Sequence, residues 1–274
     1  MNNNDYLYHY TSVETLALIL KNRSIRFNSL DKMDDLQEQE TSDLRNIGQF
    51  IYVSSWTDDE TESIPMWNMY ASLDRGIRIR LRKNPFKVYE NTAEMLSANK
   101  GSVGFDFNKE GKIYSIIPLN EIMSKGFFAN QALITKLLFK VEYTDDKDML
   151  YPKILKNDEE HFTINIGGLG KHKNLHWKFQ KEWRYILQIF PLNINQSAEA
   201  LYNDFLTVAN KIMSGIAKQP FPYYDMFLDD EAFADMQITL SPRISAGSRV
   251  IVQDLIEKYN PSAELKDSCL LGLI

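Results

Sequence analysis

The chain has 274 residues, of which 44% are hydrophobic and 25% charged, a usage that excludes a disordered, collagen-like or coiled-coil protein. Its 31 basic and 37 acidic residues give a net charge of -6, which argues against a general nucleic-acid coat protein. The single cysteine, Cys269, allows no internal disulfide. No apolar run approaches the roughly 20 residues of a membrane span, and no secretory signal is visible, so we expect a cytoplasmic protein without a membrane partner.

The first quarter of the chain alternates between strand and helix patterns. Residues 5–10 predict a strand, Thr11 or Ser12 an N-cap, residues 13–20 a helix, and residues 24–28 a second strand. Another strand is predicted at 51–56 and a short helix from Pro65 to Tyr70. We expect the acidic connector between residues 31 and 43 to be exposed and mobile.

Strict alternation of apolar and basic residues predicts a strand at residues 76–83. The apolar residues of this strand are expected to face a core. Its basic residues, Arg78, Arg80 and Arg82, are expected to face the other way. A two-residue repeat spaces their side chains roughly 7 Å apart. This row suits contacts with successive phosphates of a target, and the alternative interpretation is a solvated sheet edge.

The second half of the chain is predicted from weaker patterns. They indicate strands at 113–117, 136–143, 181–190, 236–240 and 263–265, and helices from 119, at 198–217 and at 248–259. Because strands and helices mix without regular βαβ spacing, we predict one α+β domain over residues 1–274. Its sheet is expected to be mixed, mostly antiparallel and flanked by helices.

Two short segments have both a functional and a structural interpretation. The glycine-rich run 167–173 is either a phosphate-binding loop or a flexible connector. The aromatic group Met66–Tyr70 is either core or, through Trp67 or Tyr70, a stacking wall for a planar ring. His172 and His176 lie four residues apart without the accompanying glutamate of a zinc protease, and we predict no metal site.

A series of short motifs resembles the bacterial domain-of-unknown-function family numbered twenty-nine seventy-one. In chain order they are Tyr8-His-Tyr-Thr11, Asn28 with Asp34-Asp35, Ser54-Ser-Trp56, Met66-Trp-Asn-Met-Tyr70, Arg75-Gly76 and Lys181-Glu-Trp-Arg184. The series spans nearly the whole chain. The family looks similar to phage-defence abortive-infection proteins and, more distantly, to ADP-ribosyltransferases. The resemblance therefore implies a split, mostly antiparallel sheet with NAD as substrate.

The distant resemblance also implies roles for particular residues. Glu182 would be the catalytic carboxylate that stabilises the cationic ribose centre. The residues implied to bind NAD are His9, Tyr10, Thr11, Ser54, Trp67, Tyr70 and Arg184. His9 would contact a ribose, Tyr10 or Tyr70 would stack on nicotinamide, and Arg184 or an arginine of the 78–82 row would hold the pyrophosphate. Glu182 and Arg184 have a structural alternative as exposed charges on a strand.

These inferences predict an ADP-ribosyltransferase-like toxin or phage-defence effector that modifies a nucleic-acid or protein acceptor. An antitoxin or a sensor protein would be its regulatory partner. The alternative is a non-enzymatic defence component that binds nucleic acid or a phage protein through Arg78, Arg80 and Arg82. Steep dependence of binding on salt would favour the second function.

Overall fold

The computed structural model describes residues 5–96, 104, 106–133, 136–157 and 162–274. In chain order the elements are β1 (Tyr6–Ser12), α1 (Val13–Asn22), β2 (Ser24–Ser29), η1 (Leu30–Lys32), η2 (Ile47–Phe50), β3 (Ile51–Thr57), α2 (Ile64–Met66), η3 (Trp67–Ala71), β4 (Gly76–Arg82), β5 (Tyr89–Thr92), α3 (Ala93–Leu96), β6 (Lys112–Ser115), α4 (Leu119–Lys125), β7 (Phe128–Ala129), β8 (Leu138–Lys140), β9 (Glu142–Thr144), α5 (Lys147–Leu150), β10 (Leu155–Asn157), β11 (Phe162–Ile164), β12 (His172–Asn174), η4 (Leu175–Gln180), β13 (Glu182–Phe190), α6 (Ala198–Met213), β14 (Tyr223–Phe227), α7 (Asp230–Ala234), β15 (Gln237–Leu240), α8 (Ala246–Tyr259) and β16 (Glu264–Lys266).

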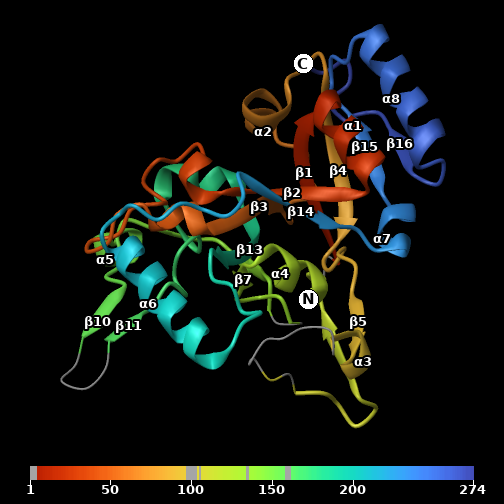
Figure 1. Ribbon diagram of the computed structural model, residues 1–274. Coiled ribbons are helices and arrows are strands. Elements are labelled where there is room, and N and C mark those ends of the chain that lie inside the picture. The colour runs from red at the N-terminus through yellow and green to blue at the C-terminus, as the bar shows by residue number, and fades with distance from the viewer. Residues whose placement is uncertain (1–4, 97–103, 105, 134–135, 158–161) are drawn as a thin grey trace.

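The main sheet has the order β14-β2-β3-β1-β4-β15-β16, and β13 joins it beside β3. All of its pairings are antiparallel except that of β15 with β16. Helices and irregular segments surround the sheet (Figure 1). The predicted α+β class with a mixed, mostly antiparallel sheet is therefore confirmed.

The sheet splits along one edge of β3. On its other edge, β3 pairs with β13 from residue 51 to residue 57. On the splitting edge, Tyr52 and Val53 pair with β2, whereas the strand pairing of β1 with β3 has the register Tyr8 opposite Thr57. Figure 1 shows the result: β1 and β4 stand upright while β2 and β3 run across the centre. The residues of β3 between these two pairings, 54–56, lie in the fork.

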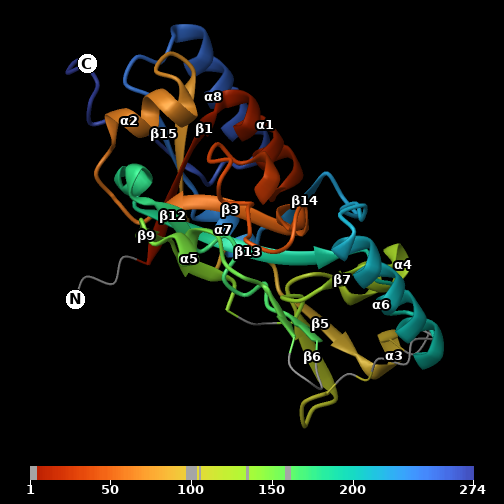
Figure 2. The same cartoon turned by 90° about the vertical axis from the view of Figure 1, so that its left-hand side faces the viewer.

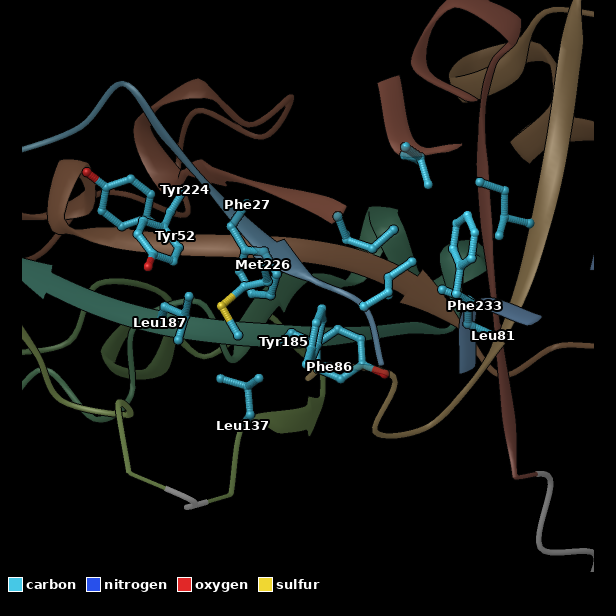
Figure 3. Packing of buried hydrophobic residues seen from close by; sticks show 14 of the residues in the cluster. Phe27, Tyr52, Leu81, Phe86, Leu137, Tyr185, Leu187, Tyr224, Met226 and Phe233 are labelled. Atoms are coloured by element: carbon cyan, nitrogen blue, oxygen red, sulfur yellow. The ribbon is translucent and has the colours of Figure 1, made fainter. Parts of the chain in front are cut away.

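A continuous hydrophobic core joins the two halves of the split sheet. It includes Leu7 of β1 and Ile79 of β4 together with Phe27 of β2 and Tyr185 of β13. The Tyr185 ring packs edge-on against Phe86 with centroids 4.9 Å apart. Figure 3 shows these two rings close to Phe27, below β2 and β3. The upright and crosswise halves are therefore held together by shared apolar packing.

The helix α1 begins where the sequence predicts. The Ser12 hydroxyl accepts a hydrogen bond from the Thr15 amide at 3.2 Å, so Ser12 is the N-cap. Apolar residues three and four apart, from Val13 to Leu20, form its buried face. The helix lies against β1, β2 and β4, and α8 packs beside it (Figure 2).

Three predictions about exposure are wrong. The connector 31–43 is not fully exposed, because Asp35 and Glu38 within it are buried. The strand β4 is no sheet edge, because it lies between β1 and β15. Lys173, expected in a flexible or phosphate-binding loop, is buried on β12. In each case the missing information is a long-range pairing that local patterns do not contain.

Candidate functional site

A cavity of about 420 Å³ opens at the fork of the sheet, within the roughly 300–1,000 Å³ that is usual for small-molecule sites. Its walls come from β1, α1, β2, β3, η3, η4, β12 and β13. The lining residues include Tyr8, His9, Tyr10, Thr11, Arg26, Lys32, Asp34, Ser54, Ser55, Trp56, Tyr70, Lys173, Gln180, Glu182 and Arg184. Segments far apart in sequence thus meet around one hollow.

Glu182 is held at this cavity by two cations. Its carboxylate accepts from Arg184 at 2.6 Å (Nε to Oε1) and 3.1 Å (Nη2 to Oε2), and Lys173 Nζ lies 3.3 Å from Oε2. Glu182 and Arg184 lie two apart on β13, so both project from the same face of the strand. Burial by itself raises the pKa of Glu182, but Arg184 and Lys173 outweigh it, so the pKa lies below the ordinary 4.5 and the group is ionised at neutral pH.

Ser55 connects His9 to Glu182. The carbonyl oxygen of Ser55 lies 2.8 Å from His9 Nδ1. The side-chain hydroxyl of Ser55 donates a hydrogen bond to the Glu182 carboxylate. Because a carbonyl can only accept, Nδ1 carries the hydrogen and Nε2 of the neutral ring is an acceptor. Burial lowers the pKa of His9 below 6.5, with the Ser55 hydrogen bond opposing that shift. At neutral pH the cavity therefore presents a neutral imidazole near an ionised carboxylate.

Tyr70 supplies an aromatic ring to the lining of the cavity. It belongs to the π-helical turn η3, and its hydroxyl accepts from Gln180 Nε2 while also bonding Asp34. Gln180 in turn accepts from Lys173 Nζ at 2.9 Å. Burial, followed by the charges of Asp34 and Glu182, raises the pKa of Tyr70, so the phenol stays neutral. A hydrogen-bonded chain therefore links the ring to the charged wall.

Most of the residues singled out from the sequence meet at this cavity. Its lining includes His9, Tyr10, Thr11, Ser54, Tyr70, Glu182 and Arg184. Tyr10 is largely buried, with its ring edge-on to Trp67 at 4.9 Å and its hydroxyl accepting from the Ser63 amide. Tyr70 is therefore the better candidate for stacking on a planar group.

Trp67 and the arginine row of β4 lie outside the cavity lining. The Trp67 side chain is 0% exposed and donates to Glu62 through Nε1, so Trp67 is a core residue and not a stacking wall for a ligand. Arg78 is buried against the Tyr8 ring and donates to the Glu60 carbonyl. The other two arginines make ion pairs within the chain: Arg80 with Asp235, and Arg82 with Glu231 and Asp235.

Sequence reasoning missed several residues of the site. Ser55 was passed over for its neighbour Ser54, whose hydroxyl instead accepts from Trp56 Nε1 at 2.9 Å. Lys173 and Gln180 reach the cavity from β12 and η4. The sequence predicted the strands that carry Ser55 and Arg184, but it did not contain the register that places these two residues opposite each other. The glycine-rich run 167–173 drew attention to Lys173, whereas no local pattern pointed to Gln180.

Comparison with known proteins gives one match. Residues 66–185 match a family described as a protein of unknown function (DUF2971). The matched region runs from the last residue of α2 to the middle of β13 and so includes Tyr70, Lys173, Glu182 and Arg184. It supports the family resemblance inferred from the motifs. No curated protein and no solved structure matches the chain.

Across residues 5–96 and the later described ranges, no helix is long and apolar enough to cross a bilayer. Among the same residues, no group of three or more histidine, cysteine, aspartate or glutamate side chains is arranged to hold a metal ion.

Proposed function

We propose that this protein is an ADP-ribosyltransferase-like enzyme that transfers ADP-ribose from NAD to a macromolecular acceptor. The observation that supports the proposal is that His9, Ser54 and Glu182, from three different strands, line one cavity at the fork of the sheet. These are the residues for which the distant family resemblance implies NAD binding and catalysis. A toxin or phage-defence role in the cytoplasm, held in check by an antitoxin or sensor, is part of the same proposal.

The reaction breaks the bond between nicotinamide nitrogen and ribose C1′, and the bonding electrons leave with nicotinamide. An oxygen or nitrogen of the acceptor forms the new bond to C1′ and releases its proton to solvent. Positive charge develops on the ribose as the first bond lengthens, and a fixed carboxylate nearby lowers the energy of that state. Glu182 is the ionised carboxylate that this step requires.

The remaining lining residues fit the other parts of NAD. The acceptor nitrogen Nε2 of His9 suits a ribose hydroxyl, and the Tyr70 ring suits the nicotinamide face. Arg184, which was expected to hold pyrophosphate, already donates to Glu182, Glu38 and the Gly170 carbonyl. We assign the pyrophosphate to Arg26 and Lys32, which also line the cavity. Arg26 pairs with Asp225 at 3.0 Å and Lys32 donates to the Pro222 carbonyl at 2.6 Å, but both side chains are more exposed than that of Arg184, so a phosphate can reach them.

The alternative function through the arginine row has less support. Arg78 is buried, and Arg80 and Arg82 already pair with acidic side chains of the same chain. A polyanion would have to displace these partners before binding. The geometry therefore favours the cavity over β4 as the functional surface.

Calorimetric titration with NAD tests the assignment of the cavity. We expect saturable binding by the unaltered protein and at least tenfold weaker binding by His9→Ala, because the ribose loses its acceptor. His176→Ala is the matched control, since His176 is exposed on η4 outside the cavity lining. Equal affinity in all three folded proteins would remove His9 from the NAD site, and no binding by any of them would count against NAD as the ligand.

A further inference from the structure

Glu38 is a fully buried carboxylate in an irregular segment of the chain. It lies between η1 and η2, and its side chain is 0% exposed. A buried carboxylate without compensation costs several kcal/mol, so its partners must offset that cost. Those partners are Lys173 and Arg184, which lie more than a hundred residues away in sequence.

The four charged groups form a closed ring. Lys173 Nζ lies 3.0 Å from Glu38 and 3.3 Å from Glu182. Arg184 makes an ion pair with the same two carboxylates, through Nη1 to Glu38 and through Nε to Glu182 at 2.6 Å. Each cation therefore touches both carboxylates, and all four side chains are 0–5% exposed.

The two carboxylates occupy different sides of the ring. Glu182, Lys173 and Arg184 line the cavity, whereas Glu38 does not and lies behind them. With Glu38 ionised, two positive and two negative charges cancel. Without it, Glu182 would face two cations, and the cavity wall would carry a net charge of about +1 in a poorly hydrated setting where charges interact strongly.

We propose that Glu38 is a positioning residue that sets the charge of the cavity wall. By sharing Lys173 and Arg184, it fixes the orientation of Glu182 and prevents the two cations from cancelling its field toward the cavity. A neutral wall tolerates the positive charge that develops on the ribose, and a positive wall opposes it. The catalytic part of this inference rests on the proposed NAD chemistry, but the charge balance does not.

The variant Glu38→Gln removes the charge with little change in shape. We expect its kcat for nicotinamide release from NAD to fall at least tenfold, with KM unchanged or lower because a positive wall still attracts pyrophosphate. The double variant Glu38→Gln with Lys173→Gln restores neutrality and should recover part of kcat. Glu40→Gln is the matched control, since Glu40 is an exposed carboxylate of the same segment and should behave as the unaltered protein.

Binding of inorganic pyrophosphate gives a readout that does not depend on NAD chemistry. We expect Glu38→Gln to bind it about tenfold tighter than the unaltered protein, and the double variant to return to the original affinity. If this holds while no variant releases nicotinamide, the charge balance stands and the proposed enzymatic function fails. Unchanged kcat and unchanged pyrophosphate affinity in a folded Glu38→Gln would overturn the inference.

Folding of the variants is itself informative. If Glu38→Gln alone does not fold, charge balance predicts that the double variant does, because it no longer buries an unpaired cation. A double variant that fails in the same way would contradict the charge-balance role.

Discussion

At the scale of single residues, the ionised Glu182 and the neutral His9 have different physical causes. Glu182 is buried, which alone would raise its pKa, but its two cationic partners lower it. His9 is hydrogen-bonded to the uncharged Ser55 carbonyl, and burial lowers its pKa. One cavity therefore combines a fixed negative charge with a neutral hydrogen-bond acceptor, a combination that suits a cationic sugar bearing hydroxyl groups.

The lowered pKa of His9 predicts a loss of stability in mild acid. Below 6.5 the histidine of the unfolded chain takes up a proton while folded His9 still resists it, so the free energy of unfolding falls as pH drops from 6.5 through the folded pKa. His9→Gln should lack this component. Urea unfolding of both proteins at pH 7.5 and pH 5.5 measures it; equal losses would show that His9 titrates normally. The Glu182 contribution is lost only below its unfolded value of 4.5 and does not interfere.

The identities of the site residues were partly predictable from the sequence. Glu182, His9 and Tyr70 belong to short motifs of the family resemblance. That resemblance predicted that they contribute to one site, and all three line the same cavity. Glu38 was expected in an exposed connector. The acidic residues around it do not indicate that Lys173 and Arg184, far away in the sequence, form ion pairs with Glu38. Buried charge pairing between distant segments is not encoded in local periodicity.

At the scale of elements, β3 determines where the cavity forms. Its central residues pair with β13 on one edge but separate β2 from β1 on the other. The residue types of these strands, aromatic in β1 and both aromatic and β-branched in β13, were sufficient to predict each strand. Their order was not predictable, because the register of a strand is fixed by partners elsewhere in the chain. For the same reason β4 was interpretable as an edge although it is central.

A tight approach between η3 and β4 explains the need for glycine at position 76. A Cβ there would lie 2.2 Å from the Ser72 carbonyl oxygen and 2.7 Å from the Ala71 Cβ. Gly76→Ala should therefore destabilise the protein by about 1–3 kcal/mol through forced backbone shifts. Denaturant unfolding measures this, with Gly247→Ala as the control, since a Cβ at Gly247 meets nothing within 4 Å. Equal free energies of unfolding for the two variants would mean that the backbone of η3 can shift to accommodate the added Cβ without loss of stability.

At the scale of the whole molecule, one core holds the two halves of the split sheet in a fixed relation. Apolar side chains of β1, β2, β4 and β13 belong to the same cluster. The cavity walls contributed by β1 and by β13 are therefore positioned by packing rather than by direct strand pairing. The α+β class was predictable from intermixed elements, whereas the fork required the full set of pairings.

The proposed activity requires that Glu182 act on NAD within this cavity. Its most direct test is nicotinamide release measured by NMR from NAD mixed with the purified protein and a bacterial extract that supplies acceptors. We predict release by the unaltered protein and by Glu257→Gln, an exposed control on α8, and a loss of at least a hundredfold in folded Glu182→Gln. Release that is undiminished in Glu182→Gln, or absent from the unaltered protein, would contradict the claim.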